Sequence, residues 1–321
     1  MHYSGEINFS GELNLLDPFS GNTKKLGGVF ATARKAVFSP NGEFVLAINT
    51  SRPSTSSPLY VSEPSGENPV VVPGSEGVSL ANFSSDGNYV AFLNLYQLSI
   101  HNRTTGETNL IELGTLDPDI FDLPAWFPDR NTFVVLVTES PSSSLPFFIE
   151  YDPATKTYEQ ISDSLTSCSE ISTSPDGRFL MYVSRSRLNS ETRYAIQRLN
   201  ISERQPQVLL DCGKRRIFNI AISPNGEWIS FLHETKKGYR YYELFLMRSD
   251  GTELRQLTDL TSDLEQPVWR PDSEGIAYLS QFELAGRKIY YYNLNTGRNS
   301  VLLNATYIDF QTWVPLITEG F

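Results

Sequence analysis

The stretch that decides the fold is ISTSPDGRFLMYVS, residues 171–184. A short strand-like segment leads into Ser-Pro-Asp-Gly, and an apolar run follows the turn. Pro presets φ for the first turn position, Asp tolerates the second, and Gly supplies the left-handed residue that closes a bulged hairpin. The segment therefore predicts a strand, a turn and a second strand that is buried on both faces.

The same pattern recurs along the whole chain at intervals of 43 to 49 residues. After each apolar strand come an aromatic-rich third strand and a polar fourth strand. Four strands per repeat are typical of a β-propeller blade. Six copies are explicit, and their turn residues are Pro40, Ser85, Pro128, Pro175, Pro224 and Pro271.

A seventh copy is divided between the two ends of the chain. DFQTWVP at residues 309–315 matches EQPVWRP at residues 265–271, and the first residues read as the three missing strands. We therefore predict an all-β fold, a seven-bladed β-propeller of four-stranded antiparallel blades in a single domain, residues 1–321. Its last blade combines about 307–321 with 5–27. A six-bladed ring is the alternative, but it leaves one end of the chain unexplained.

The turns carry a family resemblance. SPDGRFLMY at residues 174–182 and SPNGEWISF at residues 223–231 resemble the repeats of TolB-like propellers, and SSDG at Ser84 and FPDR at Phe127 are partial copies. The likeness covers essentially the whole chain and implies a propeller with binding as its default activity. Similar repeats occur in tricorn-like and prolyl-oligopeptidase-like peptidases, but no G-x-S-x-G elbow follows the last repeat here. The chain also leaves no room for the small N-terminal domain of TolB.

Composition and charge exclude several classes of protein. Hydrophobic residues make up 40% of the 321 residues, which is too much for a disordered chain. The formal net charge of -11 disfavours nucleic acid and anionic membrane surfaces as partners. We interpret the basic clusters Lys24-Lys25 and Lys214-Arg215-Arg216 as solvated loop charges.

The location follows from the absence of targeting signals in the sequence. No apolar run approaches the length that spans a bilayer, and residues 1–20 lack a basic start followed by an apolar stretch. We expect a cytoplasmic protein without membrane insertion, or a periplasmic or extracellular one if a leader has been removed. Cys168 and Cys212 are too few for a disulfide scaffold and are expected to be free.

Catalytic and metal chemistry find little support in the sequence. The only imidazoles are His2, His101 and His233, so neither a Ser-His triad nor a three-His zinc site is expected. Weak calcium candidates are Asp117, Asp119 and Asp122, which lack EF-hand spacing and read better as a solvated inter-blade loop. We predict no catalytic residues and no cofactor.

Charged side chains recur five and six residues before the turn Pro of several repeats. These positions are where the inner strands enter from the mouth of the channel. Acidic side chains outnumber basic ones at these positions. We expect the charged side chains to be solvated, paired with one another or bound to a ligand, because burying an unpaired charge costs free energy. His233 ends a second strand and should lie on the same face. The candidate site residues are Arg34, Lys35, Asp122, Glu170, His233, Glu265 and Asp309.

Two functions from different classes fit these observations. The first is a non-catalytic binding or scaffold propeller, monomeric by itself, that engages a protein or peptide partner at the channel mouth. The alternative is a hydrolase or lyase that acts on a peptide or carbohydrate through Asp122, Glu170, Glu265 and His233. A sensor domain of a larger receptor is a third possibility.

Overall fold

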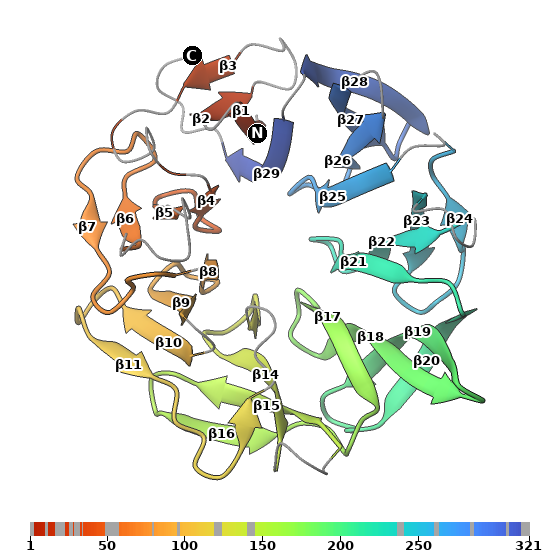
Figure 1. Ribbon diagram of the computed structural model, residues 1–321, viewed down its shortest axis with the longest axis horizontal. Coiled ribbons are helices and arrows are strands. Elements are labelled where there is room, and N and C mark those ends of the chain that lie inside the picture. Colours follow the sequence, from red (N-terminus) through yellow and green to blue (C-terminus); the bar gives the residue numbers. More distant parts are fainter. Residues whose placement is uncertain are drawn as a thin grey trace.

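The computed structural model of the chain describes most of its residues. They are 3–9, 12–16, 23–25, 28, 33, 35–48, 58–78, 80–94, 97–118, 124–139, 145–235, 241–259, 263–282, 286–305 and 308–315. The regular elements among them are β-strands, grouped in seven small antiparallel sheets that Figure 1 shows around a ring. The expected all-β propeller fold is therefore confirmed.

The first sheets in the chain are short. In spatial order from the inside of the ring, one sheet contains β29 (Ile308–Pro315), β1 (Tyr3–Phe9), β2 (Glu12–Leu16) and β3 (Thr23–Lys25). The next contains β4 (Lys35–Phe38), β5 (Val45–Ile48), β6 (Tyr60–Ser62) and β7 (Val70–Val71). The next contains β8 (Leu80–Phe83), β9 (Tyr89–Asn94), β10 (Gln97–Asn102) and β11 (Thr108–Leu110).

The remaining sheets follow in chain order. One contains β12 (Asp117–Pro118) and β13 (Ala125–Trp126), which both pair with β14 (Phe133–Thr138), then β15 (Phe147–Asp152) and β16 (Thr157–Gln160). The next contains β17 (Ser167–Thr173), β18 (Phe179–Leu188), β19 (Glu191–Asn200) and β20 (Pro206–Gly213). The next contains β21 (Ile217–Ile222), β22 (Trp228–Glu234), β23 (Tyr242–Arg248) and β24 (Arg255–Gln256). The last contains β25 (Asp263–Trp269), β26 (Gly275–Phe282), β27 (Gly286–Asn293) and β28 (Arg298–Ala305).

Strands from opposite ends of the sequence lie side by side. β29 pairs antiparallel with β1, from Tyr3 opposite Pro315 to Phe9 opposite Ile308. Figure 1 shows this pair at the top of the ring, where β1 continues into β2 and β3. The pairing gives the inner edge of β1 a hydrogen-bonded neighbour, which removes an exposed edge that could pair with another chain.

Four of the six predicted turns are organised by a buried serine. In the β17–β18 turn, the Ser174 hydroxyl donates to Asp176 Oδ1 at 2.7 Å and accepts from the Phe179 backbone N–H at 3.0 Å. Gly177 closes the turn with φ +65° and donates its N–H to the Ser174 carbonyl at 3.0 Å. The β4–β5, β8–β9 and β21–β22 turns repeat these contacts around Ser39, Ser84 and Ser223. The hydrogen bonds that hold the turn in shape are thus made by residues of the turn itself and of the strand that follows it.

The second strand is buried on both faces, as predicted, in the sheets where its side chains are described. All four residues of β5 are buried, as are the central residues of β9, β14 and β22 and the first six residues of β18. The outermost strands β7, β16 and β24 are exposed. A sheet with two apolar faces is stable only between two neighbours, which is why the core is divided into clusters between adjacent sheets.

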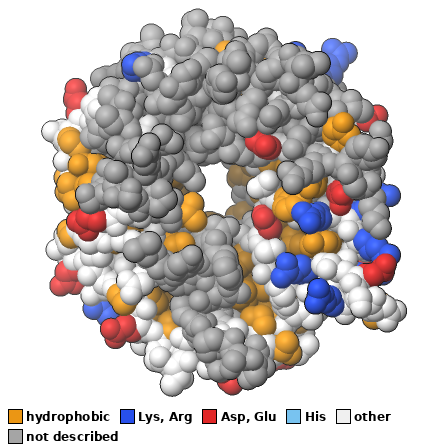
Figure 2. All heavy atoms as spheres, in the orientation of Figure 1, with side chains coloured by type: hydrophobic (Ala, Val, Ile, Leu, Met, Phe, Trp, Pro, Cys, Tyr) orange, Lys and Arg blue, Asp and Glu red, His pale blue; other side chains and the backbone are white. Residues whose placement is uncertain are grey.

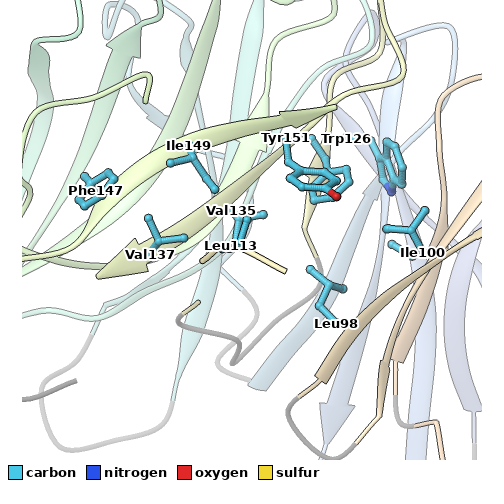
Figure 3. Close-up of a cluster of buried hydrophobic side chains, with 11 residues drawn as sticks. Leu98, Ile100, Leu113, Trp126, Val135, Val137, Phe147, Ile149 and Tyr151 are labelled. Atoms are coloured by element: carbon cyan, nitrogen blue, oxygen red, sulfur yellow. The ribbon is translucent and has the colours of Figure 1, made fainter. Parts of the chain in front are cut away.

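Figure 3 shows one of these clusters. Leu98 and Ile100 come from β10, whereas Val135, Ile149 and Tyr151 come from the next sheet. The indole N–H of Trp126, in the same cluster, donates to Asn82 Oδ1 of β8 at 3.0 Å, so a polar contact joins the inner strands of the two sheets.

The turns also touch from one sheet to the next. Arg130, at the β13–β14 turn, forms a bidentate ion pair with Glu150 at 2.7 and 3.0 Å. It also donates to the Gly177 carbonyl of the neighbouring turn at 3.3 Å. Burial opposes ionisation of Glu150, but the hydrogen bonds from Arg130 and Thr132 outweigh it and lower the pKa of Glu150. We call the end of the ring that carries these turns the turn end, and the opposite end, where the inner strands begin, the mouth end.

Replacing a turn glycine by alanine measures how tightly adjacent turns are packed. Gly177→Ala and Gly226→Ala both force alanine into a positive φ, at about 1–2 kcal/mol each. A Cβ at residue 226 would meet only Pro175 at ordinary contact distance, whereas one at residue 177 would overlap the Arg130 and Asp129 side chains. We expect urea unfolding to show up to about 1 kcal/mol of additional destabilisation for Gly177→Ala, because the Arg130 and Asp129 side chains can move aside but must give up part of their pairing. Equal unfolding free energies for the two variants would contradict the described contact between turns.

Candidate functional site

Four inner strands, β17, β21, β25 and β29, each contain a bulge near the mouth end. The register of β17 on β18 shifts between Ser169 and Ser172, which leaves one extra residue in β17. The inner strands β21 and β25 have the same shift, and a shift also occurs where β29 pairs with β1. Glu170 and Asn219 stand inside such bulges with φ +57° and +50°. A bulge re-aims the side chain that it carries, so these residues leave the regular alternation of the strand.

Glu170 connects two neighbouring inner strands. The Asn219 backbone N–H donates to Glu170 Oε2 at 3.0 Å, and both residues stand five positions before the Pro of their turns. The carboxylate therefore satisfies a backbone donor that the bulge of β21 exposes. This contact stabilises the mouth of the channel, and the assignment of Glu170 to a ligand-binding site stays a prediction.

His233 lies near the end of β22 among aromatic rings. Its ring is edge-on to Phe245 at a centroid distance of 5.3 Å, and Phe231 lies at 6.4 Å. Nδ1 is 3.1 Å from the Arg216 carbonyl oxygen, so Nδ1 carries the proton and donates. Burial lowers the pKa of His233, with a further lowering by Arg215, and the hydrogen bond and Glu234 only partly offset this. The imidazole is thus neutral at neutral pH.

The other predicted site residues are described only in part. Glu265 lies in β25 opposite Leu279 and is half-buried. The backbones of Lys35, Asp117 and Asp309 lie in β4, β12 and β29, but their side chains fall outside the described residues, and so do all of Arg34, Asp119 and Asp122.

A basic surface that was not predicted from the sequence lies at the mouth end of the β17–β20 sheet. We define it as residues 185–193 and 211–216, which contain two carboxylates, Glu191 and Asp211, and six cationic side chains. These are Arg185, Arg187, Arg193, Lys214, Arg215 and Arg216. All of the cations except half-buried Arg193 are exposed. Figure 2 shows Lys and Arg side chains gathered beside the central opening, on the side of the ring formed by β17–β24.

Strand pairing brings the two segments of the basic surface together. Arg185 is opposite Tyr194 in β19, and Tyr194 is opposite Gly213 in β20, so Lys214 follows directly. Lys214 forms an ion pair with Glu191 across the hairpin, and Arg193 pairs with Asp211 at 2.9 Å. The signal in the sequence was the run of basic residues at 214–216, but its neighbours could be identified only from the strand register.

A groove of about 590 Å³ lies at the turn end of the same two sheets. It is lined by arginines and carboxylates that pair with one another, as Arg178 does with Asp176 and Arg248 with Glu227. Three arginines face four carboxylates there, the remaining ones being Arg198, Asp250 and Glu253. The two ends of these sheets therefore differ in the sign of their local charge.

Among the residues that the structure describes, no group of three or more His, Cys, Asp and Glu side chains is arranged to hold a metal ion. Within the same ranges, no helix has the length and apolar character to cross a membrane. Cys168 and Cys212 are half-buried and not joined in a disulfide. Burial raises the pKa of the Cys212 thiol to about 12.

Comparison with known proteins shows the fold but not a family. No family model matches the chain. A stretch of 115 residues is 28% identical to a Bacillus subtilis (strain 168) protein named uncharacterized peptidase YuxL. That stretch is 35% of this chain and only 17% of the peptidase.

Several solved structures are similar to this chain in fold at low sequence identity. The propeller domain of the Trilobed protease from Pyrococcus furiosus has a TM-score of 0.66 and 12% identity, over 91% of this chain and 87% of that one. TolB from Acinetobacter baumannii has a TM-score of 0.53 and 15% identity, over 98% and 82%. Oligogalacturonate lyase in complex with manganese has a TM-score of 0.55 and 15% identity, over 68% and 63%. The expected structural similarity to TolB is confirmed, and it extends to propellers of peptidases and a lyase.

The environment of His233 predicts a pH dependence of stability. Because its pKa is lowered in the folded state, the unfolded chain takes up a proton first, near pH 6.5. Folding stability is therefore lost as the pH falls below about 6.5. The difference in the free energy of unfolding between wild type and His233→Gln should therefore change as the pH falls below about 6.5, with wild type losing stability relative to the variant. A constant difference between the two proteins at all pH values would show that burial does not lower this pKa.

Proposed function

We propose that this chain is a non-catalytic binding or scaffold propeller whose mouth end engages a protein or peptide partner. The observation that carries the proposal is the shape of the β18–β19 hairpin. β18 pairs with β17 only as far as Arg185 and continues to Leu188, so its tip projects past the inner strand. Asn189 and Ser190 close this hairpin with φ +50° and +66°, a tight turn with a defined geometry.

The exposed residues of the hairpin tip support binding to another macromolecule. Arg185, Arg187 and Leu188 are exposed, and Leu188 retains 57% of its accessible surface. The rest of the second strand is buried between neighbouring sheets, so these residues add nothing to the core of the ring. Exposed side chains on a rigid scaffold are a common arrangement for recognition of a partner.

The alternative function, a hydrolase or lyase acting on a peptide or carbohydrate, is supported by the similarity to propellers of peptidases and of a lyase. In that case the candidates remain Asp122, Glu170, Glu265 and His233. Two contacts restrict the groups that could act: Glu170 accepts a backbone N–H, and His233 donates its Nδ1 proton to a carbonyl. Only Nε2 of His233 and the remaining carboxylate oxygens would be left for proton transfer.

A site-specific photo-cross-linker tests the binding proposal. The variant Ser186→p-benzoylphenylalanine places the probe at the hairpin tip, and Ser202→p-benzoylphenylalanine places it at the turn end of the same sheet. In the native host we expect a discrete cross-linked product from residue 186 and none from residue 202. Equal products from both positions, or a product from residue 202 alone, would contradict binding at the mouth. Turnover of peptide or oligogalacturonide substrates that Glu170→Gln and Glu265→Gln abolish would favour the alternative.

We also propose that the seven sheets are the blades of one closed propeller domain, residues 1–321, in which β29 with β1–β3 forms the closing blade. The pairing of β29 with β1 supports this. Deleting residues 308–321 would leave β1 with an open edge, so we expect the midpoint of thermal unfolding to fall by roughly 10 °C or more. An unchanged midpoint would show that closure adds nothing to stability.

A further inference from the structure

We propose that the basic surface selects an acidic polypeptide segment of the partner. This inference rests on the proposed binding function and adds the chemistry of the segment that is bound. The surface carries six cations against two carboxylates, in a chain with a net charge of -11. Such a local reversal of sign attracts an acidic segment to this end of the ring while the rest of the surface repels it.

Not all cations of the basic surface form ion pairs with carboxylates of the chain. Lys214 and Arg193 are paired with Glu191 and Asp211. Arg185 and Arg187 form no ion pair within the described part of the chain. Their guanidinium groups are therefore available for the bidentate hydrogen bonds that arginine makes to carboxylates.

The direction of these side chains also follows from the strand. Met181 and Val183 of β18 pack in the cluster between the β17–β20 and β21–β24 sheets. Side chains alternate along a strand, so Arg185 and Arg187 continue this face beyond the core, toward the β21–β24 sheet. Arg215 and Arg216 lead into β21 on that side, and the Arg216 carbonyl binds His233. The two pairs of arginines thus border the space over the mouth end of both sheets.

Two observations favour an acidic polypeptide over a nucleic acid. The net charge of -11 repels a long polyanion outside the patch, whereas a short acidic segment contacts only the patch. Leu188 stands exposed beside Arg187, and an apolar side chain of a partner can cover it while a phosphate backbone cannot. We therefore assign the surface to a segment that combines Asp or Glu with apolar residues.

Fluorescence anisotropy of labelled peptides tests the assignment on the full chain. The probes are a dodeca-glutamate peptide and a dodeca-lysine peptide of the same length. We expect binding of the glutamate peptide only, weakened by added salt because the contacts are exposed. The variant Arg185→Gln/Arg187→Gln should weaken it by roughly fivefold to tenfold.

A matched control separates the patch from the overall charge of the protein. Lys156→Gln/Arg178→Gln removes the same charge from exposed positions at the turn end and should leave the affinity for the glutamate peptide unchanged. Circular dichroism and the unfolding midpoint of each variant show that the fold is retained. Equal weakening by both double variants, no binding of the glutamate peptide, or tighter binding of a single-stranded DNA of similar charge would each overturn the assignment.

The same variants distinguish this inference from the proposed function. If the partner cross-linked at residue 186 is retained by Arg185→Gln/Arg187→Gln and is not displaced by the glutamate peptide, the mouth binds a partner but the acidic chemistry is wrong. If the glutamate peptide binds as expected while cross-links form only at residue 202, the basic surface binds acids but the proposed site of the partner is wrong.

Discussion

The sheets whose side chains the structure describes carry apolar side chains on both faces, and this constraint determines the rest of the structure. β14 and residues 179–184 of β18 are buried on both faces, so the sheets that contain them must each lie between two others. The ring arrangement satisfies this requirement for every described sheet, and the exposed outermost strands β7, β16 and β24 form its rim. Polar contacts such as Trp126 to Asn82 then fix how neighbouring sheets align.

The propeller architecture could be predicted from the sequence because its signals are local. Pro175, Asp176 and Gly177 specify a turn by their own backbone preferences, and Gly177 does adopt positive φ. The role of Ser174 was not predicted, because its two hydrogen bonds reach across the turn to Asp176 and Phe179. A serine at that position reads as an ordinary polar turn residue until the geometry shows that it is buried.

The candidate site was harder to predict, because it depends on register and on packing between sheets. Glu170 could be placed near the mouth from its distance to Pro175, but its contact with Asn219 depends on a one-residue bulge in two adjacent strands. His233 was expected to lie on the mouth face, and the rings of Phe231 and Phe245 could not be placed around it from sequence. Hydrophobic periodicity reports which face of a strand is buried, not which residues of another sheet meet it.

The two ends of the β17–β24 region offer different chemistry on the same scaffold. At the turn end, arginines and carboxylates line a groove and pair with one another. At the mouth end, Arg185 and Arg187 extend beyond the core. Fold similarity to TolB and to peptidase propellers gives no preference between these ends, since the fold is shared by proteins with different activities. The distribution of charge along the strands is what favours the mouth end for recognition.

Amide hydrogen exchange, followed by mass spectrometry on the chain alone and with its purified partner, tests the central claim most directly. If the mouth end is the binding surface, the partner should slow exchange in residues 185–193 and 211–219 and leave residues 174–178 and 248–253 unchanged. Protection confined to residues 174–178 and 248–253 would place the partner at the turn end and contradict the account.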